Sequence, residues 1–287
     1  YKSSRWEKVD IHPGDFKNAA QWKLTVEANE AAEGGIHFRQ ISSESDRKTL
    51  YLGDSHMEHF WSRIDQLILD NPTKTRTAVF ITSSAFLPVP NVLIDNAPNW
   101  VGFADMMINY ALSDETVENV VLSANWGAHL VSALSYDETH ESRYYMIVDG
   151  NKQYLKAGRR VNDLVYVELQ KMITKLTNAG KKVFFVMTVV GGGPVDFERK
   201  WGEHTVKTYP NSSEWFFREY ADLRPKLMKL VKQSGAIVID PVQFMCPDGA
   251  CIHLFDDNRP VYMDGNHVSD AFMRKHGGFL DETLLFN

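Results

Sequence analysis

Five short apolar runs alternate with amphipathic stretches along this chain of 287 residues, and this alternation limits the possible folds more than any other feature. The runs have the length of strands and lie at 50–53, 78–82, 119–124, 182–188 and 235–240. The intervening stretches with helical spacing of apolar residues lie at 56–68, 100–112, 159–178 and 213–234. In the last stretch we expect an interruption or bend at Pro225. Strands that alternate with helices indicate an α/β fold with a parallel sheet covered on both faces.

Ser55 lies where the first predicted strand should turn into a helix. Residues 52–56 read Leu-Gly-Asp-Ser-His, and the helix that follows carries an apolar face of Phe60, Ile64, Leu67 and Ile68. Backbone N–H groups converge at such a junction and favour negative charge. An α/β enzyme can place there a nucleophile whose oxyanion needs stabilisation. The alternative is that Ser55 only caps its helix, and this stretch alone leaves both interpretations open.

Asp264 and His267 lie three residues apart near the other end of the chain, directly after an apolar Pro-Val-Tyr-Met. A serine nucleophile needs a base to take its proton, and the base needs a carboxylate that holds its tautomer and orientation. A turn with an Asp-x-x-His pattern can direct both side chains to one point. By itself the pattern is common by chance, whereas its combination with Gly-Asp-Ser after the first strand is specific.

Together these motifs resemble the SGNH (GDSL-type) hydrolase superfamily, in which the first block carries the serine and the last carries Asp-x-x-His. Ser55, Asp264 and His267 match those positions. A closer resemblance is to the SGNH domains fused behind acyltransferase-3 membrane domains in bacterial surface-polysaccharide O-acetyltransferases. The segments that point there are LGDSH at 52–56, VVLSANW at 120–126, CPDGAC at 246–251 and PVYMDGNHVS at 260–269. The three-layer α/β/α fold that this resemblance implies agrees with the strand and helix pattern.

The resemblance covers roughly residues 48–285 and divides the chain into two parts. We expect residues 1–47 to be an N-terminal extension or linker that packs on the domain, and residues 48–287 to be the SGNH catalytic domain. The chain does not begin with Met and shows no signal peptide, so we expect an excised region of a longer protein.

The resemblance also implies an oxyanion hole made by the backbone N–H of Ser55 and the side-chain amide of Asn125. Asn125 follows the third strand, although the usual Gly-x-Asn-Asp wording is absent, and the alternative is an ordinary turn residue. A family glycine that would supply another donor does not appear after the second strand, where Ser83 and Ser84 stand instead. Either a backbone N–H at 83–84 replaces it, or the hole has two donors only. We expect His56 and Trp126, which directly follow Ser55 and Asn125, to line the substrate; the alternative for His56 is that it tunes the pocket.

The implied activity is transfer of an acetyl group through an acetyl-serine to a sugar hydroxyl of O-antigen lipopolysaccharide or a related surface glycan. The donor would be presented by an acyltransferase-3 transmembrane domain of the same full-length protein, which makes this chain a periplasmic domain of an inner-membrane protein. One alternative is a secreted SGNH esterase that deacetylates polysaccharide. Another is an inactive glycan-binding module, against which the intact Ser55, Asp264 and His267 argue.

Composition excludes several other classes. A net charge of −6 argues against nucleic acid and against an anionic membrane surface as main partners. No run of about 18 apolar residues spans a bilayer, and 44% hydrophobic content suffices for a full core in one domain. We expect no cofactor and no metal. A zinc site in particular is not expected, since two cysteines without a nearby Cys/His pair do not complete a tetrahedral zinc shell.

The cysteines, Cys246 and Cys251, flank a Pro-Asp-Gly turn that suits disulfide formation. Two reduced thiols in a cytosolic protein are the alternative. With the resemblance we favour the disulfide and an oxidising compartment, the periplasm. Four tyrosines between 127 and 156 belong either to a lid or hairpin near the site or to an amphipathic surface. His129, like His204, His253 and His276, is expected to be a surface or structural residue.

Overall fold

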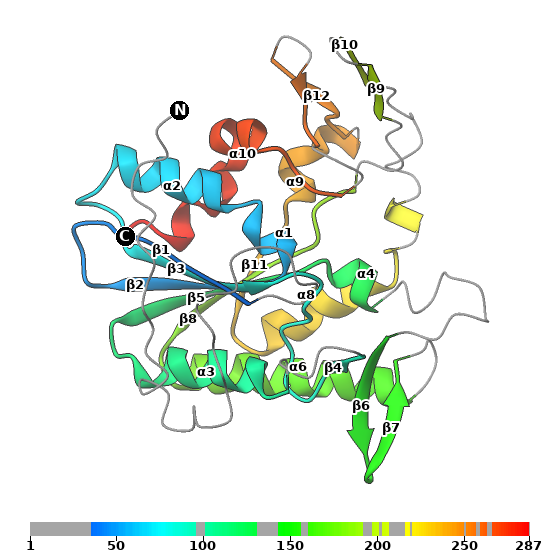
Figure 1. Ribbon diagram of the computed structural model, residues 1–287. Coiled ribbons are helices and arrows are strands. Elements are labelled where there is room, and N and C mark those ends of the chain that lie inside the picture. Colours follow the sequence, from blue (N-terminus) through cyan, green and yellow to red (C-terminus); the bar gives the residue numbers. More distant parts are fainter. Residues whose placement is uncertain are drawn as a thin grey trace.

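A six-stranded sheet forms the centre of the computed structural model (Figure 1), with the strand order β1-β3-β2-β5-β8-β11. The strands are β1 Ile36–Ile41, β2 Lys48–Gly53, β3 Thr77–Ser83, β5 Val117–Ser123, β8 Lys182–Val186 and β11 Ile237–Ile239. The structure describes residues 36–95, 101–130, 143–155, 160–191, 197–200, 203–206, 216–218, 220–249, 251–256, 259–262 and 266–286.

The five parallel strands predicted from the sequence are all present. β2 pairs in parallel with β3 and with β5, β5 with β8, and β8 with β11. Every residue of β3 is buried, and so are five of the six residues of β2. This explains why these strands read as continuous apolar runs, since helices cover both faces of the sheet.

The prediction of a purely five-stranded sheet was wrong at one edge, where β1 adds a sixth strand antiparallel to β3. β1 was missed because its sequence, IHFRQI, is polar on one face, as an edge strand allows. Its side chains also contact the first helices: His37 Nδ1 lies 2.7 Å from Glu58 Oε1, and the Arg39 guanidinium lies over the Trp61 ring at 3.7 Å. Residues 36–41 of the expected 1–47 extension thus form an edge strand of the central sheet; the division of the chain at residue 47 stays a prediction.

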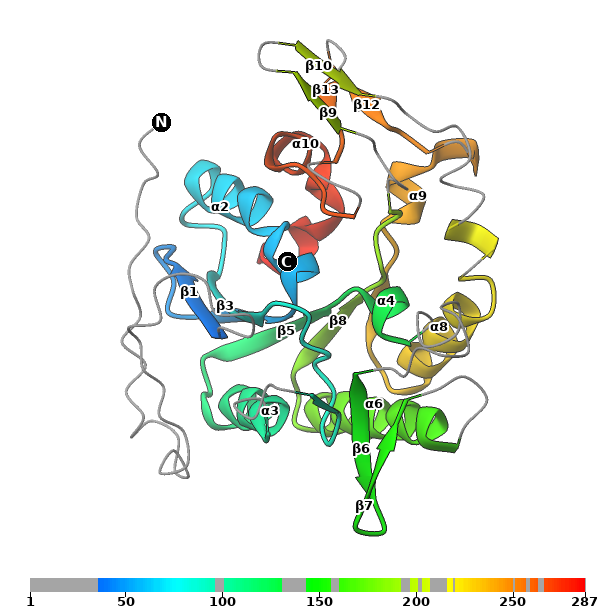
Figure 2. The same ribbon diagram turned by 45° about the vertical axis from the view of Figure 1, so that its right-hand side comes forward.

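Helices cover the two faces of the sheet, as both views show (Figures 1 and 2). One layer contains α3 Phe103–Ser113, α6 Arg160–Asn178 and α8 Leu223–Gln233. The other contains α1 Ser55–Glu58, α2 Trp61–Asp70, α10 Asp270–His276 and the 3₁₀ segment η5 Gly277–Thr283. This is the three-layer α/β/α architecture that was expected.

Two helix predictions need correction in detail. The single helix expected after Ser55 is two helices, because the chain breaks at His59 and Phe60 between α1 and α2. Its predicted apolar face is correct, since all four residues named for it are buried. Pro225 does not bend a long helix: α8 begins at Leu223, so the proline occupies the first turn, where its missing N–H costs no helical hydrogen bond.

Within the part of the chain that the structure describes, three small sheets stand outside the central one. β4 Leu93–Ile94, β6 Tyr144–Val148 and β7 Asn151–Tyr154 form one, in which β6 and β7 make the hairpin that projects from the body (Figure 2). This confirms a hairpin in the tyrosine-rich stretch. The others pair β9 Phe197–Lys200 with β10 Glu203–Val206, and β12 Leu254–Phe255 with β13 Arg259–Pro260. Further short helices among the described residues are α4 Trp126–Leu130, α9 Val242–Met245 and η4 Pro247–Gly249.

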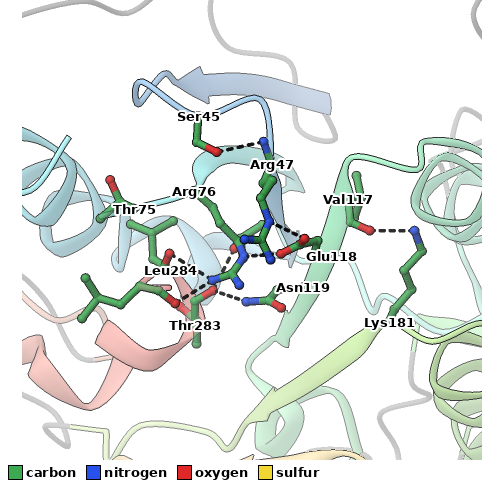
Figure 3. A network of polar contacts seen from close by, with 12 residues as sticks. Ser45, Arg47, Thr75, Arg76, Val117, Glu118, Asn119, Lys181, Thr283 and Leu284 are labelled. Atoms are coloured by element: carbon green, nitrogen blue, oxygen red, sulfur yellow. Dashed lines mark hydrogen bonds and ion pairs between the residues drawn. The ribbon is translucent and has the colours of Figure 1, made fainter. Parts of the chain in front are cut away.

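The C-terminal segment closes the amino ends of the central strands (Figure 3). The Thr283 carbonyl accepts hydrogen bonds from Asn119 Nδ2 and Thr49 Oγ1, both at 2.8 Å. Arg76 donates from Nη1 to the Leu284 carbonyl and from Nε to a Glu118 carboxylate that it shares with Arg47. These contacts satisfy the polar groups at one end of the sheet and leave the carboxyl ends of the strands for the site.

Candidate active site

Ser55 is the first residue of α1 and follows the carboxyl end of β2 by two residues. The close approach of β2 to β5 just before Ser55 requires a glycine at position 53, because a Cβ there would lie 1.7 Å from the backbone oxygen of Ser123 in β5. Asp54 is the N-cap of α1, and its Oδ1 accepts the His56 N–H at 2.8 Å. Asp54 therefore performs the helix capping that was the alternative role for Ser55. Among the described residues, no acceptor takes the Ser55 N–H.

His267 Nε2 lies 2.8 Å from Ser55 Oγ, although 212 residues separate the two in sequence. Two backbone contacts close the base of the loop that carries His267. Tyr262 and Val268 form an isolated antiparallel β-bridge, and the Ser269 N–H donates to the Val261 carbonyl at 2.7 Å. Serine and histidine are thus within the distance needed for proton transfer. Asp264, expected to orient the histidine, lies outside the described residues, so its place in a triad stays a prediction.

Asp54 is a buried carboxylate beside the nucleophile, with 1% of its surface exposed. Its Oδ2 accepts the Asn125 N–H at 3.0 Å and lies 2.7 Å from His129 Nε2. Burial alone would raise the pKa of Asp54. The hydrogen bond from His129, electrostatic interaction with His56 and His129, and the Asn125 N–H together outweigh burial and hold this pKa below its ordinary value.

Asn125 follows the carboxyl end of β5 by two residues, as Ser55 follows the end of the neighbouring strand β2, so the pairing of the two strands brings these residues together. Its Oδ1 accepts the Ala128 N–H at 3.0 Å and so caps the short helix α4. The amide nitrogen Nδ2 is the other end of this planar group and has no hydrogen-bond acceptor within the described structure. Capping by Oδ1 thus leaves the amide N–H₂ available for the predicted oxyanion role, which stays a prediction.

His56 and His59 form a cluster with His267, and ring centroids lie 5.1 Å apart for His56–His267 and 6.3 Å for His59–His267. His59 Nδ1 accepts the Val268 N–H at 3.4 Å, next to His267 in the chain. Burial, followed by electrostatic interaction with His56 and His267, keeps the pKa of His59 well below its ordinary value. His59 is therefore a neutral histidine that holds the His267 loop, a role that the sequence analysis did not predict.

The two residues expected to line the substrate are both buried. His56 is 3% exposed but contacts the His267 ring, so it lies in the site. Trp126 is fully buried, stacks on Phe185 at 4.5 Å and donates from Nε1 to the Val186 carbonyl. These contacts make Trp126 a packing residue that anchors α4 to β8, and contact with a substrate is not supported by its position.

The loop after β3 forms a tight turn in which the Phe86 N–H donates to the Ser83 carbonyl at 3.1 Å. Ala85 adopts the left-handed conformation with a φ of 57°, which is uncommon for a residue with a Cβ. The Ala85 carbonyl accepts the Tyr144 hydroxyl at 2.5 Å. This turn is where the family glycine is missing, and the choice of a further oxyanion donor at 83–84 stays a prediction.

Cys246 and Cys251 form a disulfide, as predicted. The Ile252 N–H donates to the Met245 carbonyl at 2.7 Å, which closes the same loop through the backbone. Within the residues that the structure describes, no group of three or more His, Cys, Asp and Glu side chains is arranged to hold a metal ion. In the same part of the chain, no helix is long and apolar enough to cross a bilayer.

The comparisons with known proteins agree with this geometry. A family model described as "SGNH domain (fused to AT3 domains)" matches residues 26–281, nearly the whole chain and including β1. The chain belongs to this family.

Among solved structures, the chain is similar to the periplasmic domain of a lipopolysaccharide acetyltransferase from Salmonella ser. Paratyphi A. The sequence identity is 12%, the match covers 84% of this chain and 84% of that chain, and the TM-score is 0.54. It is also similar to the acetyl xylan esterase AlAXEase at 14% identity, with 82% of this chain and 96% of that chain covered and a TM-score of 0.45. At these identities the likeness concerns the fold. The comparison with curated proteins found no significant match.

The place of His129 in the site was not predicted. It was expected to be a surface or structural residue; at 5% exposed it is not at the surface, and its contact with Asp54 beside the nucleophile fits the structural alternative. One signal was present in the sequence: His129 comes four residues after Asn125, one helical turn away. Because the partner Asp54 is 75 residues distant, only the pairing of β2 with β5 brings them together.

Proposed function

We propose that this SGNH domain is an O-acetyltransferase that moves an acetyl group through an acetyl-serine onto a sugar hydroxyl of O-antigen lipopolysaccharide or a related surface glycan. The observation that carries the proposal is the 2.8 Å contact between Ser55 Oγ and His267 Nε2, in a family whose domains are fused to AT3 domains. The acetyl donor would reach Ser55 from the AT3 membrane domain, and the site would face the periplasm. The disulfide between Cys246 and Cys251 fits that oxidising compartment.

In the first half of the reaction, His267 Nε2 takes the Ser55 proton as Oγ attacks the acetyl carbonyl carbon. The carbonyl electrons move to oxygen, and the Ser55 N–H and Asn125 Nδ2 donate hydrogen bonds to this oxyanion. Collapse of the tetrahedral intermediate breaks the bond to the donor's leaving group, which takes the proton from His267. The product is acetyl-Ser55.

In the second half, the acceptor hydroxyl gives its proton to His267 Nε2 while its oxygen attacks the acetyl-serine carbonyl. The intermediate collapses, Ser55 Oγ leaves with the proton from His267, and the sugar ester is released. Asp264 would hold the imidazolium in both halves. Water in place of the sugar would make the same residues an esterase, so transfer requires that the sugar reaches the acyl-enzyme before water does.

Turnover of p-nitrophenyl acetate by the chain, beside its Ser55→Ala and His267→Ala variants, tests the serine chemistry. We expect both variants to lose activity by roughly 1000-fold or more. His276→Ala is the matched control, since this histidine is exposed and its ring stacks on Phe272, so its loss should leave the rate unchanged. Wild-type turnover no faster than that of Ser55→Ala would refute the proposed chemistry in this chain.

Acetylation of surface glycan in cells that express the AT3-fused protein tests transfer itself. We expect acetylated glycan with wild type and none with Ser55→Ala, as measured by mass spectrometry of the released glycan. Loss of acetyl groups from glycan upon expression of the wild type would instead establish the esterase. Unchanged acetylation in the Ser55→Ala cells would show that the domain has a binding role only.

A further inference from the structure

A buried chain of contacts leads away from the nucleophile through Asp54, His129 and Tyr144 to Ala85. His129 Nε2 lies 2.7 Å from Asp54 Oδ2, and the two side chains are 5% and 2% exposed. The His129 ring meets Tyr144 edge to face, with centroids 5.0 Å apart. The Tyr144 hydroxyl then donates to the Ala85 carbonyl. These contacts connect four segments that are distant in sequence: the N-cap of α1, helix α4, strand β6 and the turn after β3.

The direction of the bond between Asp54 and His129 follows from chemistry. Asp54 is ionised, since its pKa is held below the ordinary value, and a carboxylate can only accept hydrogen bonds. His129 must therefore carry its proton on Nε2 and donate it to Asp54. A bond between a carboxylate and a donor in such a buried place is stronger than one at the surface.

His129 also holds Asn125 in two ways. Its backbone N–H donates to the Asn125 carbonyl at 3.0 Å, and its side chain shares the Asp54 Oδ2 that accepts the Asn125 N–H. The other oxygen of Asp54 accepts the N–H of His56, the residue after Ser55. A single carboxylate, fixed by His129, thus sets the distance between the backbone at Ser55 and the backbone at Asn125.

From this geometry we propose that His129 is a positioning residue for the oxyanion hole: through Asp54 it aligns the Ser55 N–H with the Asn125 amide. The inference rests on the proposed function, because it concerns the two donors of that reaction. Tyr144 extends the same alignment to the turn at Ala85. Loss of His129 leaves the contact between Ser55 and His267 intact but lets Asn125 move away from the Ser55 N–H, which weakens stabilisation of the transition state more than substrate binding.

The test compares His129→Leu with His129→Gln, whose amide nitrogen reaches about as far as Nε2 and can still donate to Asp54. The readouts are kcat and KM for p-nitrophenyl acetate and the urea unfolding midpoint. We expect His129→Leu to lower kcat about 100-fold with KM changed less than about threefold, since loss of an oxyanion donor costs roughly that much. His129→Gln should return kcat to within about tenfold of wild type. If His129→Leu does not fold, His129→Asn, whose amide is too short to reach Asp54, replaces it with the same expected loss.

Asn125→Ala supplies a further readout that a merely structural role would not move. If His129 acts through Asn125, the double variant His129→Leu/Asn125→Ala should be no slower than the slower single variant. Thr283→Val is the stability control, because it removes buried hydrogen bonds at the opposite end of the strands. It should lower the unfolding midpoint and leave kcat unchanged.

Two kinds of result would overturn the inference, and they are distinguishable. If Ser55-dependent turnover persists in His129→Leu within threefold of wild type, or the two single losses multiply in the double variant, His129 does not position the hole and the proposed function stands. If wild type is no faster than Ser55→Ala, the proposed function fails, and the inference fails with it.

Discussion

Replacement of Gly53 by alanine should damage both the fold and the site, because this residue brings β2 against β5 just before Ser55. A Cβ here would lie 1.7 Å from the Ser123 carbonyl oxygen, half of the 3.4 Å at which ordinary contact begins, and 2.9 Å from Met57 Cβ. Because the nearer of these two atoms belongs to the backbone of Ser123, no side-chain rotation can relieve the clash, and the strand pairing of Gly53 with Ser123 must open. Overpacking and the lost hydrogen bond together should lower the free energy of unfolding by about 3 kcal/mol.

The same displacement should reduce turnover of p-nitrophenyl acetate about 100-fold, since a shift of about 1 Å in a reacting group has an effect of that size. Urea unfolding and kcat measured on the same samples check both numbers. Gly278→Ala is the matched control, because its Cβ would meet nothing closer than 3.8 Å. A Gly53→Ala variant that unfolds at the wild-type urea concentration and keeps its kcat would refute the packing argument.

Three further predictions concern single contacts. Thr283→Val removes the hydrogen bond between Thr283 Oγ1 and the Tyr51 hydroxyl, both buried, and should cost about 1–2 kcal/mol in urea unfolding; an unchanged midpoint would contradict it. Burial lowers the pKa of His59, so the unfolded chain binds a proton below about pH 6.5 that the folded chain does not, and stability should fall from there toward its folded pKa. His59→Asn, which keeps an acceptor near Nδ1, should flatten this dependence between pH 7 and pH 5, and an equally steep dependence would refute the assignment. Reduction of the Cys246–Cys251 disulfide should lower stability by about 2 kcal/mol, and a Cys246→Ser/Cys251→Ser variant should not respond to dithiothreitol.

Much of the fold was predictable because its signals are local. The five parallel strands are buried on both faces and so read as apolar runs, and helical spacing identified α3, α6 and the buried face of α2. The edge strand β1 escaped because only one of its neighbours is a strand and half its surface is polar. The break between α1 and α2 escaped as well, since its two residues carry no helix-breaking signal such as Pro or Gly.

The candidate site, like the fold, could be predicted from the sequence only in part. Gly-Asp-Ser at a strand end and His267 near the other terminus could be named from the sequence, and the structure brings Ser55 and His267 within 2.8 Å of each other. The surroundings of these residues could not be named. Asp54 was part of a turn in the sequence, and nothing local connected it to His129 or to the backbone of Asn125.

The sequence by itself thus determined the alternation of strands and helices, the family motifs and the serine–histidine pair, because each depends on spacing along the chain or on residue type at a turn. Tertiary structure alone decided which buried groups meet. Parallel pairing of β2 with β5 carries Asp54 to Asn125 and His129, and the closed loop at Val268 carries His267 to His59. Such contacts depend on strand order and loop closure, which bring residues 71 to 209 positions apart to hydrogen-bond distance.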